Sequence, residues 1–284
     1  MQKYAKRLQT RKPDGTNKKH SGAFKNINGI LKLINTFKGG LTMKYYKITN
    51  KDEIHRGLQY KTGLNVDIQT FNPTGDCQDG GIYFAREDIL SFLSYGLWIR
   101  EVMLPKDARI YKNPGTPEKW KADKVILGQR RKITAEVVKE LIAEGAKATE
   151  DALYRAAERG HLEIVKVLLS AGAKPTEDAI YWAADRGYLE VVKILLKAGA
   201  KATDYALNGA ARNGYLELVK VLLSAGAKPM DVALNYAAGN GHLEVVNVLL
   251  SAGAKPTDVA LDRAAIYGYL EIVKVLEAAR KEKK

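Results

Sequence analysis

The sequence predicts an α+β chain that is mainly α-helical, with a solenoid of helix pairs in 27-residue repeats preceded by a small α/β domain. Three observations lead to this fold class. One motif recurs at constant spacing, the apolar pattern changes near residue 133, and the excess positive charge is confined to the first half of the chain. A constant period of about 20 to 50 residues indicates stacked units that bury their apolar faces against one another. We therefore expect a basic extension at 1–42, an α/β domain at 43–132 and a repeat solenoid at 133–284.

The composition is that of a folded chain in a reducing compartment. Hydrophobic residues make up 46% and charged residues 27% of the 284 residues, which supplies packed cores and excludes wholesale disorder. A single cysteine, Cys77, excludes an internal disulfide and a cysteine-based zinc site. We find no apolar run of membrane-spanning length and no secretory signal. The sequence therefore predicts an intracellular protein that is not secreted and has no transmembrane segment.

The net charge of +14 is unevenly distributed. Residues 1–42 carry ten Lys and Arg against one acid, residues 43–132 carry sixteen against eleven, and residues 133–284 carry twenty of each. Nucleic-acid binding needs clustered Lys and Arg, so it would fall on residues 1–42. Apolar side chains recur at helical spacing there, at Phe24, Ile27, Leu31, Ile34 and Phe37. One interpretation is a basic amphipathic helix that binds an acidic membrane surface, RNA or a partner groove. The other is a solvated, partly helical extension.

Short extended apolar runs follow from Met43. They predict strands at 45–49, 64–68, 82–84, 99–104 and 109–111, and a helix at 86–95. The loop between the second and third of these strands holds the turn-forming residues FNPTGDCQDGG. The pattern indicates a small α/β domain.

A Gly-(His/Tyr)-Leu-Glu motif defines the repeat. It occurs every 27 residues, at Gly160, Gly187, Gly214, Gly241 and Gly268. A first helix begins at a Thr followed by an acid, as at Thr176, Thr203 and Thr257, because the hydroxyl caps the free N–H groups. Met230 breaks this pattern and leaves Asp231 as the expected cap. Residues 134–147 match only a second helix, so we expect the α/β domain to cover the open side of the array.

Within each pair, two alanines allow the first helices to approach closely, and the following glycine suits a left-handed C-terminal cap. The second helix follows at once. In the unit after Gly160 the predicted buried stripe consists of Leu162, Val165, Leu168 and Leu169, while Glu163 and Lys166 face water. The last helix ends in charged residues, which indicates a cap of the array.

The strings GHLEVV, LLSAGA and AL..AA resemble those of ankyrin repeats, over roughly residues 133–284. Ankyrin repeats usually have about 33 residues, so the missing residues predict fingers trimmed to short turns. The resemblance implies a non-enzymatic scaffold or adaptor that binds a partner protein on the concave helical face. The strings GLNVD, FNPTG, GGIYF, WIREVMLP and KWKADKVILG resemble the module that precedes such repeats in giant-virus proteins. That family implies a host-interacting or assembly-related binding protein, located in the host cell.

In an ankyrin-like array the residue pairs before each Gly line the concave face, and they differ between repeats here. Tryptophan, tyrosine and arginine are frequent hot-spot types in protein interfaces. The predicted partner-binding residues are Arg155, Trp182, Arg186, Tyr236 and Tyr267. The alternative is that these residues pack against neighbouring repeats or form a variable solvated surface.

The sequence contains little that suggests catalysis, a cofactor or a metal. His161 and His242 share a repeat position with tyrosines, so this position predicts packing and hydrogen bonding and not metal binding. Cys77 could pair with His55 as a nucleophile, but neighbouring acids disfavour its thiolate.

A further alternative rests on the order of strand, GGIYF, helix and WIREVMLP, which resembles the core of ADP-ribosyltransferase-like folds. Under this alternative, residues 43–132 would form an enzyme in which Arg56, Tyr83 and Glu101 contact a nicotinamide dinucleotide. No glycine-rich loop leads into a helix with Gly-Lys-Ser/Thr, so nucleotide hydrolysis is not expected.

Overall fold

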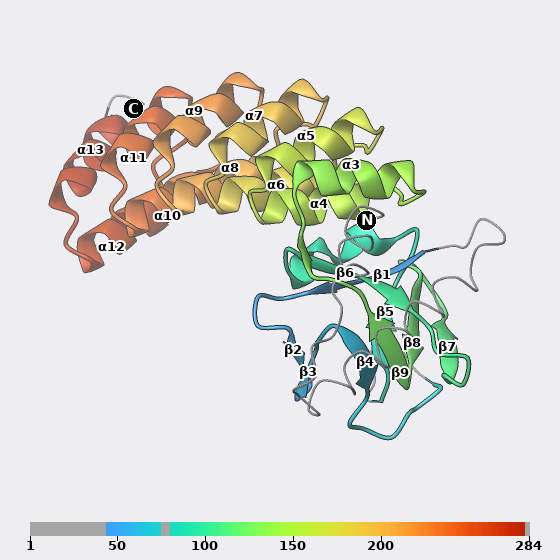
Figure 1. The fold of residues 1–284 in the computed structure, drawn as a ribbon. Helices are drawn as coiled ribbons and strands as arrows, with labels where there is room; N and C mark the ends of the chain where they lie inside the picture. Colours follow the sequence, from blue (N-terminus) through green and yellow to red (C-terminus); the bar gives the residue numbers. More distant parts are fainter. Residues whose placement is uncertain (1–43, 75–79, 282–284) are drawn as a thin grey trace, which may run out of the picture. The chain divides into compact units, whose positions relative to one another are not determined.

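The computed structural model describes residues 44–74 and 80–281. These residues belong to one compact unit, Lys44–Lys284, in which a strand-rich part precedes an array of paired helices (Figure 1). The predicted α+β, mainly helical fold class is confirmed. The amphipathic segment expected within residues 1–42 and the residue Cys77 lie outside the described residues.

The strand-rich part contains two antiparallel sheets, a short hairpin and a 3₁₀ helix. The larger sheet has the order β1-β6-β9-β4, with β10 paired to β6. Its strands are β1 (Tyr45–Thr49), β4 (Gly63–Val66), β6 (Trp98–Met103), β9 (Lys124–Leu127) and β10 (Arg131–Lys132). The smaller sheet has the order β5-β8-β7, formed by β5 (Ile82–Phe84), β7 (Ile110–Asn113) and β8 (Lys119–Ala122). The hairpin is β2 (Ile54–His55) with β3 (Leu58–Gln59), and the 3₁₀ helix is η1 (Ile89–Tyr95).

Strand β1 contributes to two apolar cores, because successive side chains of a strand point to opposite faces. Tyr46 and Ile48 join the cluster that continues into the helices. On the other face, Tyr45 packs against a second cluster that includes Phe84 and Val102. Lys47 shares this second face and is buried.

The predicted strands 45–49 and 82–84 are confirmed to the residue, and the other three are shifted by one or two positions at their ends. The segment predicted as a helix at 86–95 is instead the shorter 3₁₀ helix η1. The sequence analysis did not predict β8 or β9. In β8 the apolar alternation is absent, because Lys121 holds a fully buried position.

The array consists of two rows of helices, as Figure 1 shows. The first helices of the pairs are α4 (Glu150–Glu158), α6 (Glu177–Asp185), α8 (Asp204–Arg212), α10 (Asp231–Gly239) and α12 (Asp258–Ile266). The second row contains α3 (Ala135–Ala143), α5 (Leu162–Ser170), α7 (Leu189–Lys197), α9 (Leu216–Ser224), α11 (Leu243–Ser251) and α13 (Leu270–Lys281). The alanine pairs of the first helices are buried, except for Ala265 in the last one. Close packing of these small residues places the first helices on the inner side of the curved array (Figure 1).

Threonine caps begin the first helices, as predicted. The hydroxyls of Thr176, Thr203 and Thr257 accept a hydrogen bond from the backbone N–H three residues on. The expected cap at Asp231 is wrong. Met230 occupies the cap position and offers no side-chain oxygen, while Asp231 is the first helical residue and accepts a hydrogen bond from the backbone N–H of Lys255 at 3.2 Å.

The connections between repeats confirm the trimmed fingers, because segments such as 171–176 join one pair to the next without a strand. The predicted buried stripe of the first complete second helix needs one correction. Its fully buried residues are Ile164, Val165 and Leu168, whereas Leu162 and Leu169 are half-buried.

The strand-rich part covers the open end of the array, as expected, at the place of the missing first helix. Helix α3 lies in the second row and packs against α5, and η1 packs against α4 in the place of a first helix. Two backbone hydrogen bonds join the parts: Ile133 donates to Leu97 at 2.8 Å, and Lys147 donates to Glu87 at 2.7 Å. A single apolar cluster therefore continues from β1 and η1 through the array.

Candidate protein-binding surface

The predicted partner-binding residues lie on what we call the first-helix surface, the exposed side of α4, α6, α8, α10 and α12. Arg155, Trp182 and Tyr236 occupy one repeat position on α4, α6 and α10. Arg186 and Tyr267 occupy the position that ends α6 and α12. The structure thus places all five residues in two parallel rows along the array.

Trp182 belongs to an aromatic pair on this surface. The ring of Tyr181 meets its indole edge-on at 5.2 Å between centroids. The guanidinium of Arg186 lies 5.7 Å from the indole centroid, at the distance of a cation–π contact. Trp182 and Arg186 are therefore brought together, whereas Tyr236 lies two repeats away and contacts the guanidinium of Arg212 at 6.0 Å.

A ladder of bonds between repeats runs through the same surface. Arg159, Arg186, Asn213 and Asn240 share one repeat position, and the side chain of each bonds back to the preceding unit. Arg159 donates to the carbonyl of Ser94 in η1 at 3.0 Å, so the ladder begins in the strand-rich part. Arg186 reaches Glu158 at 3.5 Å. These residues therefore hold neighbouring repeats together as well as facing solvent.

The sequence analysis missed the acidic members of this ladder. Asp185 pairs with Arg212 exactly one repeat later, and its backbone carbonyl accepts a hydrogen bond from the Asn213 side chain at 3.0 Å. The carboxylate of Glu158 similarly forms ion pairs with Arg155 and Arg186. The signal that could have found them is a spacing of 27 or 28 residues between opposite charges, because residues one repeat apart touch in a stacked array.

Ion pairing does not bury the predicted arginines. The side chain of Arg186 remains 42% exposed and that of Arg155 34% exposed. A guanidinium has five N–H donors, so a single carboxylate partner leaves donors for another molecule. Tyr267 is the most exposed of the five predicted residues, at 65%.

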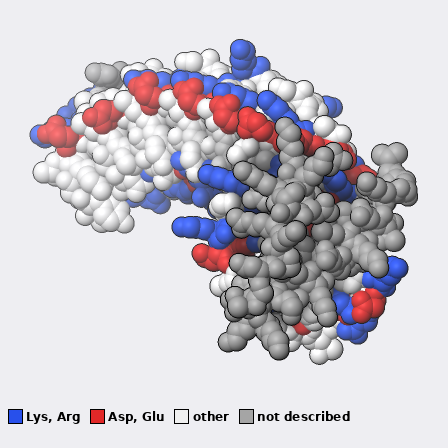
Figure 2. All heavy atoms as spheres, viewed as in Figure 1, with Lys and Arg blue, Asp and Glu red and all other residues white. Residues whose placement is uncertain are grey.

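The second helices present a different surface. An acid and a lysine three residues apart pair on four of them, at 2.6 Å for Glu163 and Lys166 and at 2.7 Å for Glu190 and Lys193. Figure 2 shows the acids as a regular row along the array with basic residues beside them. Such exposed pairs contribute little stability. Because this outer surface is nearly the same in each repeat, it offers little that could select a particular partner.

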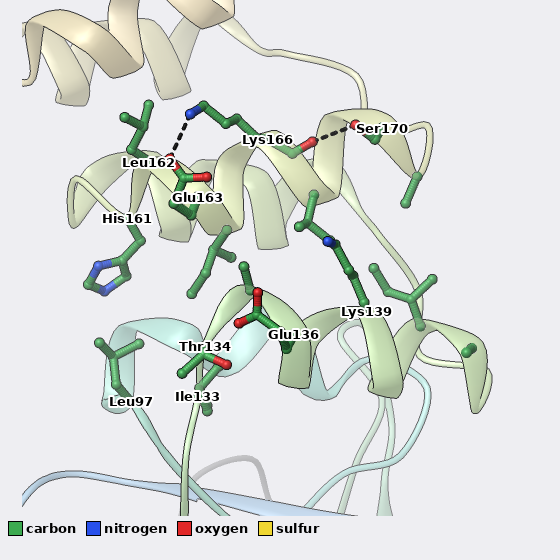
Figure 3. Close-up of a pocket in the computed structure, with 16 residues that line it drawn as sticks. Leu97, Ile133, Thr134, Glu136, Lys139, His161, Leu162, Glu163, Lys166 and Ser170 are labelled. Atoms are coloured by element: carbon green, nitrogen blue, oxygen red, sulfur yellow. Dashed lines mark hydrogen bonds and ion pairs between the residues drawn. The ribbon is translucent and has the colours of Figure 1, made fainter.

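An open groove of about 960 Å³ lies between α3 and α5 (Figure 3). Apolar residues such as Leu97, Ile133 and Leu162 line it, together with the charged side chains of Glu136 and Lys139 on α3 and their counterparts on α5. His161 also lines the groove, and burial with the nearby Arg159 charge lowers the pKa of its imidazole. The equal number of acids and bases gives the groove no preference for either sign of charge.

The residues proposed for dinucleotide contacts do not form one site. Arg56 and Tyr83 line a common cavity in the strand-rich part. In the pairing of β1 with β6, Glu101 lies opposite Tyr46, and Arg100 lies opposite Lys47. Neighbouring residues of a strand point to opposite faces, so the side chain of Glu101 lies on the other face of the sheet from that of Lys47. His55 lines the cavity, but its proposed partner Cys77 lies outside the described residues.

Within residues 44–74 and 80–281, no three His, Cys, Asp or Glu side chains are grouped as metal ligands. In the same part of the chain, no helix has the length and apolar character needed to cross a membrane. The shared position of His161 and His242 is a packing position, as predicted: His242 lies against Gly214, and its Nε2 is 3.0 Å from the carbonyl oxygen of Arg212.

Comparison with known proteins gives similarities to one family. Three proteins of Acanthamoeba polyphaga mimivirus are similar in sequence. One, named as an ankyrin repeat protein, is 36% identical over 126 residues, which is 42% of this chain and 63% of its own length. A second with such a name is 40% identical over 100 residues, 30% of this chain and 33% of its own length. A third, named as uncharacterized, is 42% identical over 90 residues, 30% of this chain and 65% of its own length.

The chain spans less than two thirds of the length of each of these relatives. A family model described as ankyrin repeats in three copies matches residues 130–206 and 207–284, which together exceed half of the chain. The matched region coincides with the helix pairs of Figure 1. The chain therefore belongs to the ankyrin-repeat family, and its relatives place it among the ankyrin-repeat proteins of giant viruses.

Proposed function

We propose that this protein is a non-enzymatic scaffold that binds a partner protein through the first-helix surface, inside the host cell. The observation that supports it most is the cluster of Trp182 and Arg186, which combines an aromatic ring with a partly exposed guanidinium. Residues of these two types contribute most of the binding energy in many protein interfaces. The predicted binding residues extend the surface along the array to Arg155, Tyr236 and Tyr267.

Variation between repeats supports the choice of this surface. The position of Trp182 is occupied by arginine, glycine, tyrosine and arginine in the other repeats, whereas the outer helices repeat nearly the same Glu–Lys pair. Gly209 separates Trp182 from Tyr236, so the two aromatic side chains are about 20 Å apart if successive helices are spaced by about 10 Å. Two separated aromatic anchors of this kind suit a protein surface better than a small molecule.

The test compares the affinity of a purified partner for matched variants. A partner captured with the full chain from host-cell lysate would be measured against Trp182→Ala and Arg186→Ala. Each change is expected to weaken binding at least tenfold, because a hot-spot side chain commonly contributes more than about 1.4 kcal/mol. Lys193→Ala and Lys220→Ala remove exposed side chains of the outer helices and are expected to leave affinity unchanged.

Two controls keep this test interpretable. Because Arg186 also bonds to Glu158, the thermal midpoint of each variant shows whether the array is intact. Unchanged affinity in a folded Trp182→Ala, Arg186→Ala double variant contradicts the proposal. Nuclease treatment and rising salt separate the alternative in which residues 1–42 bind nucleic acid or an acidic membrane surface, since that binding falls steeply with salt.

A further inference from the structure

The strand-rich part contains a closed-in cavity that the scaffold function does not use. Its volume is about 160 Å³, and it lies between β1, the β2–β3 hairpin, β5 and η1. A protein cavity of about 150 Å³ holds one benzene molecule. The space is therefore suited to a ligand built on one six-membered ring, and it is too small for a dinucleotide.

Lys47 is the unusual residue of this cavity. The residue is only 6% exposed, although lysine is rarely buried without an ion-pair partner. Its Nζ donates a hydrogen bond to the carbonyl of Tyr83 at 2.8 Å and lies 4.5 Å from the ring centroid of Tyr60. Within residues 44–74 and 80–281, no carboxylate oxygen lies within ion-pair distance of Nζ. Two neutral groups therefore hold a buried ammonium in place.

The carboxylate that lines the cavity is already paired with another residue. Glu53 also lines the cavity, but Arg100 binds both of its oxygens at 2.8 Å, and both residues are buried. The hydrogen bond from Arg100 keeps the pKa of Glu53 below its usual value, so Glu53 is ionised and its charge is already compensated. Glu53 also adopts a left-handed backbone, with φ of 56°. Such strain is found most often at binding sites.

The walls of the cavity favour a planar anion. Lys47 lines it with Glu53, whose charge Arg100 compensates, and Arg56 and Lys119 also line it while interacting with other groups. Aromatic rings form much of the remaining wall, including those of Tyr60, Tyr83 and Phe92. A buried charge is costly unless it is paired, so a ligand carboxylate beside Lys47 would gain a charge-assisted hydrogen bond.

We propose that this cavity binds a small planar carboxylate, a single aromatic or similar ring bearing one carboxylate group that pairs with the Lys47 ammonium. The ring would pack among the tyrosine and phenylalanine side chains. The protein would thereby bind a small molecule in its strand-rich part in addition to a partner protein on its array. The inference is independent of the proposed scaffold function, since the two sites share no residues.

The proposal has a pH signature. Burial lowers the pKa of Lys47 to about 7, with the charge of Asp67 acting in the opposite direction. The other groups around the Lys47 side chain are Glu53, His55, Arg56, Tyr60, Tyr83 and Arg100. The pKa of His55 is lowered and that of Tyr60 is raised, both mainly by burial, while Glu53 stays ionised. The lowered pKa of Lys47 thus lies at the lower end of the range from pH 7 to 9, in which Glu53 is already ionised.

The experiment measures the affinity of the full chain for three probes by calorimetry at pH 6.5. Benzoate has ring and charge, benzamide has the ring without the charge, and acetate has the charge without the ring. Benzoate is expected to bind at least tenfold more tightly than either of the others. Its affinity is expected to fall as the pH rises from 7 to 9, because the neutral amine must first take up a proton, whereas benzamide binding stays constant.

Lys47→Met is expected to lose the preference for benzoate over benzamide, while Lys193→Met on the outer face leaves it unchanged. Replacing an unpaired buried charge by an apolar side chain is often neutral or stabilising, so this variant should fold. If it does not, the pH series on the unaltered chain decides. Equal affinity for benzoate and benzamide, no benzoate binding at pH 6.5, or a benzoate affinity independent of pH would each overturn the proposal.

Discussion

At the glycine after each of the first helices α4, α6, α8 and α10, a ring of the next repeat lies where a Cβ would project. Gly160, Gly187, Gly214 and Gly241 all have positive φ, between 70° and 79°. A Cβ built at Gly214 would lie 2.6 Å from the His242 ring, and one at Gly187 would lie 2.7 Å from the Tyr215 ring. The Gly-(His/Tyr) motif thus records a contact between neighbouring repeats and not only a turn.

Gly214→Ala is expected to destabilise the array by about 2 to 4 kcal/mol, the sum of left-handed backbone strain and overpacking against His242. Gly226→Ala is the matched control. It shares a positive φ of 96° but has no atom within 4 Å of the added Cβ, so it should cost only about 1 kcal/mol. Urea denaturation of both variants measures the difference. Equal losses would show that the ring contact does not matter.

At the scale of one helix, α10 differs from the other first helices in its start. Thr149, Thr176, Thr203 and Thr257 each cap their helix through the hydroxyl, whereas Met230 has no oxygen to offer. Its backbone is nevertheless extended, with ψ of 153°, as at the threonine caps. The side chain is 47% exposed, so replacing it leaves no internal cavity.

Met230→Thr is expected to stabilise the protein by about 0.5 to 1 kcal/mol, because the new hydroxyl can accept a hydrogen bond from the N–H of Ala233, which here donates to the carbonyl oxygen of Met230 at 3.0 Å. Met230→Val has nearly the shape of threonine without the hydroxyl and is expected to give no such gain. Thermal unfolding of the two variants side by side isolates the hydrogen bond. A valine variant as stable as the threonine variant would assign the effect to shape.

The helical array could be predicted from the sequence because each unit repeats the same local signals. Threonine caps, paired alanines and the Gly-(His/Tyr) turn recur at a fixed period, so the structure predicted for one unit applies to nearly all of them. The site could be predicted only by residue type. The bonds of Arg159, Arg186 and Asn213 to preceding units depend on stacking geometry, which the periodicity implies but does not specify.

The strand-rich part was harder to predict for a physical reason. In β8, which the sequence did not predict, Lys121 takes a fully buried position that an apolar residue normally occupies. A buried lysine masks the alternation by which strands are recognised. The buried polar residues Lys47 and Arg100 have roles beyond packing, since Lys47 lines the cavity and Arg100 compensates the charge of Glu53.

In the molecule as a whole, the strand-rich part completes the array. It supplies η1 beside α4, continues the apolar cluster, and begins the ladder of the first-helix surface with the bond from Arg159 to Ser94. The tyrosine hydroxyl of Tyr46 and the ammonium of Lys44 both bond to Glu144 at the end of α3. The first-helix surface is therefore held by contacts that extend beyond the repeats.

The most direct test of the proposed function is site-specific photo-crosslinking to the partner in the intact complex. A benzophenone side chain would replace Trp182 or Tyr236 on the first-helix surface, and Lys193 or Lys220 on the outer helices. The account predicts crosslinks to the partner from positions 182 and 236 and none from 193 and 220. Crosslinks from the outer positions alone would contradict it and assign partner binding to the second helices.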